Sequence, residues 1–244
     1  MSQYNVSDKT KMKEHRGEFE GSDYNPYIRA TEQRGHLGMT SAVKDWLTGR
    51  QVHLLSKGEV MLYYILRWRD DVIDVREQFP LPIDKTEPIA DRYGLRHPRL
   101  KGILTPLTTD LVVTLRNGQM EAYSVKFSRK AFHKSERQEK NVFLQKIYWD
   151  EADVRFRQVY TDEMNRGLFE NIRRVVTYWN PEEVTDKVSL LMHYVAHKQI
   201  QIDMETKVID MVSFIKIADR LISDNNYLSF MSDRQRKKEL PLAV

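Results

Sequence analysis

Three charged residues have types and positions that suit metal-dependent hydrolysis. Asp110 stands at the start of the apolar run DLVVTL, and Lys126 stands near the end of the run MEAYSVKF. Glu59 lies earlier, in the first turn of a predicted helix. Carboxylate oxygens bind Mg²⁺, and a nearby cation can orient an attacking water or offset charge on a scissile phosphate. The order helix-Glu, strand-Asp, strand-Lys therefore favours phosphodiester cleavage.

A predicted hairpin would bring Asp110 and Lys126 together. Residues 116–119 read RNGQ, and Asn-Gly is a strong turn signal because both residues tolerate positive φ. Side chains alternate between the faces of a strand, so Ser124 shares a face with Lys126 whereas Glu121 points to the other face. We therefore expect Asp110, Ser124 and Lys126 at the open end of one antiparallel pair.

Each of the three residues also has a structural interpretation. Ser56 and Glu59 fit a helix capping box. Asp110 fits a turn aspartate at the end of a strand, and Lys126 fits a solvated lysine on an edge strand. Considered one at a time, each residue is explained by its structural role alone. Only the joint order of the three residues along the chain indicates a site.

The composition excludes several classes of protein and of catalytic or metal site. Hydrophobic residues make up 41% and charged residues 30% of 244 residues, which is typical of a soluble globular protein. The chain contains no cysteine, which excludes disulfides, thiolate zinc sites and a cysteine nucleophile. No apolar stretch approaches the roughly 20 residues that cross a bilayer, and the N-terminus lacks the apolar core of a secretion signal. We therefore expect a cytoplasmic protein that does not bind membranes.

The basic residues are concentrated beside the predicted hairpin. The net charge of +4 permits a nucleic-acid partner without requiring one. Fixed cations release counterions when they meet a phosphate backbone, and a helix that follows the hairpin is rich in them. The candidate DNA contacts are Arg129, Lys130, Lys134, Arg137 and Lys140. A merely solvated helix face is an equally good interpretation.

One histidine pair has the spacing of a metal site. His193 and His197 are four residues apart on a predicted helix, so both rings fall on one face. A zinc protease motif would also place an acid next to the first histidine, and the acid is missing here. We therefore interpret the pair as part of a helix surface.

The hydrophobic pattern predicts a mixed α/β core. Its elements are a capped helix over 57–68, a strand over 72–80, a hairpin over 110–127, a helix over 134–152 and a strand over 154–162. Residues 81–102 are predicted to form an irregular connection, and SAVKDWL at 41–47 is predicted to add a short helical turn.

Three regions follow from this pattern. Residues 1–50 are polar with scattered glycines and are predicted to form an extended arm with little regular structure. Residues 51–165 form the α/β core. Residues 166–244 form a smaller, mainly helical domain that ends in a short predicted strand, YLSFM, and a charged tail.

Six segments resemble, in this order, the signature of the TnsA family of transposon endonucleases: LLSKGEVMLYYILRW, DVREQFPL, RHPRLKG, TTDLVV, YSVK and IYW. The hexapeptide REQFPL at 76–81 is the most specific of them. The resemblance covers about residues 20–180 and is weak beyond. It implies a restriction-endonuclease-like α/β fold with a PD-(D/E)XK-type site, followed by a winged-helix-like C-terminal domain.

The resemblance also implies roles for particular residues. The family's catalytic glutamate, aspartate and lysine fall on Glu59, Asp110 and Lys126. Mg²⁺, with Mn²⁺ as a substitute, would be bound by Glu59, Asp110 and the backbone carbonyl of Val125. Ser124 departs from the pattern because an acid or a glutamine usually precedes the lysine by two residues. Gln145 stands where relatives can have an acid, so both residues are only supporting candidates.

The activity implied is hydrolysis of the non-transferred 5′ strand of double-stranded DNA at transposon ends. The implied partners are a DDE transposase, TnsB, which cuts and joins the other strand, and an AAA+ ATPase regulator, TnsC. Two alternatives stay open. The chain could be a stand-alone nuclease of the restriction or junction-resolving type, or a non-catalytic DNA-binding assembly subunit.

Overall fold

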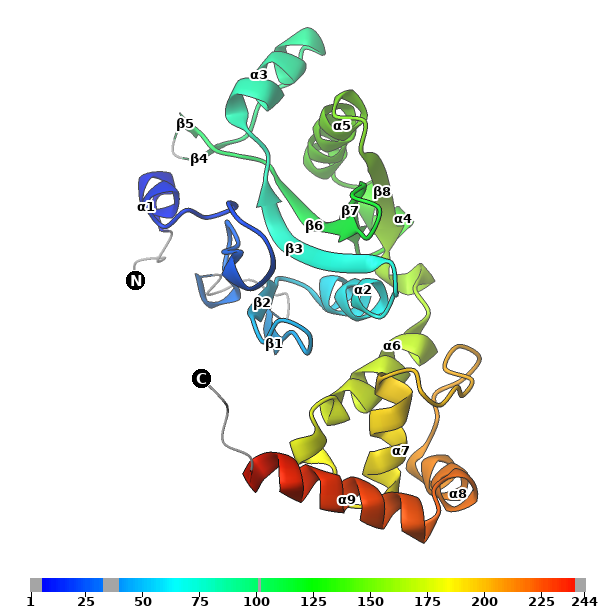
Figure 1. The fold of residues 1–244 in the computed structure, drawn as a ribbon. Coiled ribbons are helices and arrows are strands. Elements are labelled where there is room, and N and C mark those ends of the chain that lie inside the picture. The colour runs from blue at the N-terminus through cyan, green and yellow to red at the C-terminus, as the bar shows by residue number, and fades with distance from the viewer. Residues whose placement is uncertain (1–5, 33–39, 101, 240–244) are drawn as a thin grey trace, which may run out of the picture. The chain divides into compact units, whose positions relative to one another are not determined.

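The computed structural model describes residues 6–32, 40–100 and 102–239 (Figure 1). The chain divides into two compact units, Met1–Met164 and Asn165–Val244. The second unit begins one residue before the boundary predicted at 166. The first unit holds a mixed sheet between helices, so the predicted α/β class is confirmed.

A four-stranded sheet with the order β3-β6-β7-β8 forms the centre of the first unit. Strands β3 (Val72–Pro80), β6 (Thr108–Leu115) and β7 (Met120–Lys126) are antiparallel neighbours. Strand β8 (Arg155–Tyr160) runs parallel to β7. The turn between β6 and β7 lies at Asn117-Gly118, with Gly118 at φ 82°, as the sequence predicted.

The sheet buries one apolar layer on each face. Helix α2 (Lys57–Arg67) and strand β2 (Gln51–Leu54) cover one face, whereas α3 (Ile83–Arg92) and α5 (Glu136–Glu151) cover the other (Figure 1). Alternation along β6 supplies both layers: Leu111 and Val113 pack toward α2, and Val112 packs toward α5. Each such side chain contributes about 1.5–3 kcal/mol when fully buried. This packing fixes α2, and therefore its first turn, against the strands.

The N-terminal segment packs against edge strand β3, so the prediction of an extended arm is wrong for residues 6–32. The segment contains α1 (Asp8–Lys13) and the 3₁₀ turns η1 (Gly21–Asp23) and η2 (Ala30–Glu32). The Tyr24 hydroxyl donates to the Glu77 carbonyl at 2.8 Å. Gly17, at φ 85°, lies so close to Pro80 that a Cβ would be 2.1 Å from its ring. A segment that covers an edge strand blocks pairing with other chains.

Two other local predictions are also wrong. SAVKDWL at 41–47 contains β1 (Ser41–Lys44), which pairs with β2. The segment 81–102 contains α3 and the first strand of a small hairpin, β4 (Arg99–Leu100), whose partner is β5 (Ile103–Leu104). Pro88 inside α3 obscured that helix, because proline removes a backbone donor. Burial of Ile89 and Ala90 on the sheet side outweighs that penalty.

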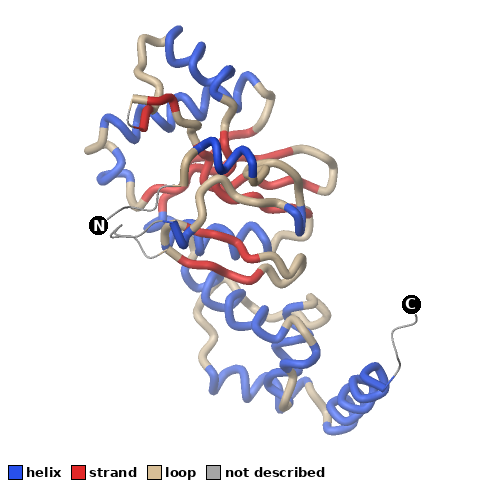
Figure 2. Tube along the Cα trace, turned by 90° about the vertical axis from the view of Figure 1, so that its left-hand side faces the viewer, coloured by secondary structure: helices blue, strands red, loops and turns tan. Residues whose placement is uncertain are grey.

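Helices make up the second unit over residues 165–239 (Figure 2). They are α6 (Arg166–Val175), α7 (Lys187–Ala196), α8 (Met211–Leu221) and α9 (Asp224–Glu239), together with η4 (Val176–Tyr178) and η5 (Pro181–Glu183). The mainly helical prediction is confirmed. The predicted strand YLSFM lies inside α9 instead, because Ser223 accepts the Asn226 N–H and starts a helix. The β-wing of a winged helix is not present among residues 165–239. None of the described helices is long and apolar enough to span a membrane.

Candidate active site

Asp110 is the point where the hairpin residues meet. Its Oδ2 atom accepts the Val125 backbone N–H at 2.6 Å and the Ser124 hydroxyl at 3.2 Å. The Lys126 Nζ atom lies 3.4 Å from the same oxygen and 2.9 Å from the Val125 carbonyl. Glu121 lies toward the turn and pairs with Arg69. The structure therefore places Asp110, Ser124 and Lys126 together and Glu121 apart, as the alternation predicts.

The backbone is irregular at the position of Asp110. The β6–β7 pairing ends at Leu111 and Tyr123, so the Asp110 carboxylate receives the Val125 N–H in place of a main-chain carbonyl. On the other side of β6, the pairing with β3 includes Glu77↔Leu111 and Phe79↔Thr109 and passes over Gln78 opposite Asp110. Gln78 has φ 47°, which costs a non-glycine residue about 1–3 kcal/mol. The local opening of the ladder frees Asp110 to present its carboxylate.

Glu59 is positioned by the start of α2. Ser56 is the N-cap, and its hydroxyl oxygen accepts the Glu59 backbone N–H. The Glu59 side chain turns back, so that Oε1 accepts the Ser56 hydroxyl at 2.9 Å and Oε2 accepts the Leu55 N–H at 2.9 Å. Gln78 Nε2 donates to Oε2 at 3.1 Å. The predicted Ser56 cap is therefore confirmed, but Glu59 does not complete a capping box, because it accepts the Leu55 N–H and not the Ser56 backbone N–H.

Burial and the charge of Asp110 raise the pKa of Glu59 to about 8, although three hydrogen bonds oppose the shift. A buried carboxylate loses its hydration, and a second carboxylate nearby further disfavours its charged form. A bound cation would remove both penalties. The physical state of Glu59 thus fits a metal ligand better than a helix cap alone.

A cavity of about 610 Å³ joins these groups. Glu59, Asp110, Val125 and Lys126 all line it. Its oxygen donors are two carboxylates and the Val125 carbonyl, the hard ligands that Mg²⁺ prefers. No group of three His, Asp or Glu side chains suited to a metal is found within the described ranges. Mg²⁺ usually keeps water and phosphate ligands beside one or two carboxylates, so the residues present fit this ion.

The two supporting candidates have different environments. Ser124 is fully buried and donates to Asp110, so it orients that carboxylate. Gln145 is buried on α5, and its Oε1 atom has no hydrogen-bond partner among the described residues. Helix α5 contributes Gln138, not Gln145, to the lining described for the cavity.

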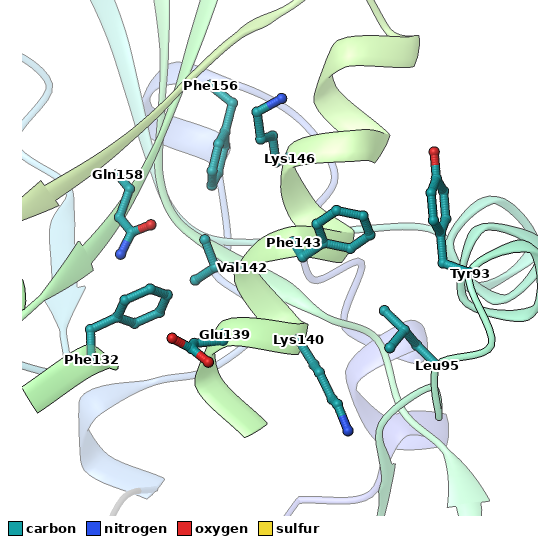
Figure 3. Close-up of a pocket in the computed structure, with 10 residues that line it drawn as sticks. All are labelled: Tyr93, Leu95, Phe132, Glu139, Lys140, Val142, Phe143, Lys146, Phe156 and Gln158. Carbon is teal, nitrogen blue, oxygen red and sulfur yellow. The ribbon is translucent and has the colours of Figure 1, made fainter. Parts of the chain in front are cut away.

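A second cavity has a volume of about 710 Å³, and Figure 3 shows the residues that line it. Phe132 lines both cavities. The second is mainly aromatic and aliphatic, with Phe143, Phe156 and Tyr93 in its wall. The predicted acids and Lys126 line the first cavity and not the second.

The candidate DNA contacts fall into two groups. Arg129 forms a two-bond ion pair with Glu163, and Lys140 pairs with Glu136. Lys130, Lys134 and Arg137 are exposed, and no described acidic side chain pairs with them. Arg129 begins the short helix α4 (Arg129–Phe132), directly after β7. A cation without an acidic partner can neutralise a DNA phosphate and release the counterion bound there without first breaking an ion pair. The second group is therefore better suited to contact the phosphate backbone of DNA.

His193 and His197 stabilise the second unit. His193 Nδ1 donates to the Tyr178 carbonyl at 2.8 Å, and His197 Nε2 donates to the Trp179 carbonyl at 2.9 Å. The His197 ring stacks on Trp179 with centroids 4.1 Å apart. These contacts join α7 to the preceding turn, so the pair has a structural role, but the rings are half-buried and do not form the helix surface that was predicted.

The sequence did not predict the role of Gln78, although this residue belongs to REQFPL, the most specific of the sequence motifs. Within that hexapeptide Glu77 is fully buried and forms two bonds with Arg50, at 2.7 and 2.8 Å. Phe79 packs near Trp149, and Leu81 lies in the core. Gln78 alone reaches the catalytic candidates. The motif therefore combines structural residues with one that contacts the site.

Comparisons with known proteins point to the same chemistry. Residues 69–161 match the family described as TnsA-like endonuclease N terminal. The chain is also 29% identical over 241 residues to the transposon Tn7 transposition protein TnsA of Escherichia coli. Residues 69–161 therefore form a domain similar to the N-terminal domain of TnsA-like endonucleases. The alignment covers 92% of this chain and 87% of the relative, so the similarity extends past residue 180, where the sequence motifs become weak.

The matched segment contains most of the candidate site. The segment that matches the family contains Asp110, Val125 and Lys126, and Glu59 precedes it by ten residues. These matches support an endonuclease that acts in transposition, and the mixed α/β core is consistent with a restriction-endonuclease-like fold.

Proposed function

We propose that this TnsA-like chain hydrolyses the non-transferred 5′ strand at transposon ends, with Mg²⁺ bound by Glu59, Asp110 and the Val125 carbonyl. The convergence of the two carboxylates and Lys126 on one cavity carries the proposal. Mn²⁺, which accepts the same oxygen ligands, should substitute. A bound divalent ion would supply Lewis acidity to the phosphate and lower the pKa of a water.

The protein groups would perform the remaining work. Asp110, and Glu59 once it has lost its proton to an arriving cation, would place negative charge in a partly buried site, where it attracts a cation more strongly than in water. Lys126 Nζ, which donates to Asp110 and to the Val125 carbonyl, can place positive charge next to the scissile phosphate as it gains charge. Ser124 and the Val125 N–H keep the Asp110 carboxylate in one orientation.

We also propose a partner arrangement. A DDE transposase, TnsB, would cut and join the other strand, and an AAA+ regulator, TnsC, would control the complex. The unpaired cations Lys130, Lys134 and Arg137 would contact the DNA backbone beside the cavity. The helical unit 165–244 would contribute to the contacts with DNA and the regulator. Support for these partners comes from similarity to a Tn7 transposition protein.

Strand-labelled transposon-end DNA tests the proposal. Wild-type protein is incubated with Mg²⁺ or Mn²⁺, with and without the cognate transposase, and each strand is analysed separately. We expect cutting of the non-transferred strand that depends on the transposase. Cutting of the same strand by this chain alone would support a stand-alone nuclease of the restriction or junction-resolving type.

The same assay examines the non-catalytic alternative. Ser124 is the residue that most favours that alternative, because a neutral serine replaces a usual ligand. An assembly subunit would bind DNA and transposase but leave the 5′ strand intact while the transposase remains active. Calorimetry with Mn²⁺ adds an independent measurement. An intact site should give a heat of binding in the wild type that Asp110→Asn removes, whereas a decayed site should give the same heat in both proteins.

A further inference from the structure

Gln78 connects the central sheet to the glutamate of the site. It lies in β3, yet its side chain crosses to α2, where Nε2 donates to Glu59 Oε2 at 3.1 Å. Its Oε1 atom accepts the Thr108 hydroxyl at 3.2 Å, which fixes the orientation of the amide. The side chain is 2% exposed. A buried amide with both ends hydrogen-bonded has a single low-energy orientation.

The donors around Glu59 determine which of its oxygens stays available. A carboxylate has about four acceptor positions, two on each oxygen. Oε2 accepts two bonds, from the Leu55 N–H and from Gln78, whereas Oε1 accepts only the Ser56 hydroxyl. Oε1 therefore keeps an open acceptor position. Removing the Gln78 donor would open a position on Oε2 as well and would allow the carboxylate to rotate.

The backbone of Gln78 suggests that this contact has a function. Its φ of 47° is unusual for a residue with a Cβ, and it lies within a strand whose neighbours Glu77 and Phe79 pair regularly. Strain of this kind persists where the surroundings enforce it, and it is frequent at functional sites. Gln78 also lies opposite Asp110, so the same irregularity serves both acidic residues.

We propose that Gln78 is a positioning residue, which orients the Glu59 carboxylate so that Oε1 is the oxygen presented to a divalent cation. The inference rests on the proposed metal-dependent function and assigns Gln78 a role that it performs through Glu59. Groups that orient metal ligands commonly change metal affinity 10–100-fold when they are removed.

The test measures metal affinity apart from activity. Gln78→Met keeps the length of the side chain and removes its donors. Calorimetry with Mn²⁺ on the full chain should show a Kd about tenfold weaker or more, with a thermal midpoint close to that of the wild type. The lost cutting should return as Mn²⁺ is raised, a response that a general folding defect would not give. Gln158→Met is the matched control, since Gln158 bonds Tyr160 on β8, and it should bind Mn²⁺ as the wild type does.

Thr108→Val provides a second variant if Gln78→Met fails to fold. It removes the hydroxyl that fixes the amide, so a smaller loss of Mn²⁺ affinity is expected. An unchanged Kd in a folded Gln78→Met protein, or in Thr108→Val if the first variant does not fold, would overturn the inference. Failure of the wild type itself to bind Mn²⁺ would instead refute the proposed metal site, so the two failures are distinct.

Discussion

Gly58→Ala tests how tightly the start of α2 is packed against the site. Gly58 is the second residue of the helix and precedes Glu59. A Cβ there would lie 2.1 Å from Thr161 Oγ1 and 2.8 Å from Val125 Cγ1. Both atoms belong to short branched side chains, which cannot move away as a long side chain can. The helix must therefore shift, and Glu59 must shift with it.

The expected loss of stability follows from two opposing terms. Overpacking of this kind costs about 1–3 kcal/mol. Alanine in place of glycine returns up to about 1 kcal/mol through helix propensity. The net effect is a loss between zero and about 3 kcal/mol, and each kcal/mol lowers the thermal midpoint by about 2–4 °C in a chain of this size. Cutting should fall further than this loss of stability explains, because Glu59 is displaced.

Calorimetric unfolding and the cutting assay measure the two effects. Gly167→Ala is the matched control, because Gly167 is also the second residue of a helix, α6, and its nearest neighbour would be 3.3 Å away. It should change stability by no more than about 1 kcal/mol. Thr161→Ala added to Gly58→Ala removes the closest contact and should recover part of the loss. Wild-type stability and cutting in Gly58→Ala would refute the packing argument.

Three further predictions concern the surroundings of the site. Arg50→Met should destabilise the first unit by about 3–5 kcal/mol, because it leaves the fully buried Glu77 carboxylate without its cation; urea unfolding followed by tryptophan fluorescence measures this, and a loss below 1 kcal/mol would contradict it. Burial lowers the pKa of His53 below its ordinary value of 6.5, so the folded protein favours the neutral ring. This contribution to the unfolding free energy is fully present above pH 6.5 and is lost as the pH falls below 6.5, because the unfolded chain binds the proton more readily. The unfolding free energy of His53→Gln should therefore fall less than that of the wild type between pH 7.5 and 5.5, and parallel curves would refute the assignment. Replacing Lys130, Lys134 and Arg137 together by alanine should reduce the log–log slope of DNA binding against salt by about 2.7, or about 0.9 for each cation. Arg129→Ala, which breaks an ion pair, should reduce the slope by clearly less than about 0.9, and a reduction of about 0.9 would show that the ion pair does not matter.

The sequence predicted the core because local signals there agree with the tertiary packing. Ser56 and Glu59 mark the start of α2, and Asn117-Gly118 marks the turn of the hairpin. Period-two alternation then places Asp110 and Lys126 at the same end. These features depend on residues close together in the chain, and the structure contains them where they were predicted.

The errors arise where distant contacts override local preference. Pro88 suggested a loop, but burial against the sheet stabilises α3. Residues 6–32 look polar and irregular, yet Tyr24 and Gly17 fit onto edge strand β3. The position of Gln78 beside Glu59 depends on a positive φ within a strand, which no local pattern predicts. The REQFPL motif indicated that the segment matters without showing how.

The most direct measurement compares wild type with Asp110→Asn on strand-labelled transposon-end DNA, with Mg²⁺ and the cognate transposase present. Asparagine keeps an oxygen that can accept the Val125 N–H, so the hairpin should remain folded, which circular dichroism checks. We expect the wild type to cut the non-transferred strand and Asp110→Asn to leave it intact, while the transposase still cuts its own strand. Normal cutting of the non-transferred strand by folded Asp110→Asn would contradict this expectation.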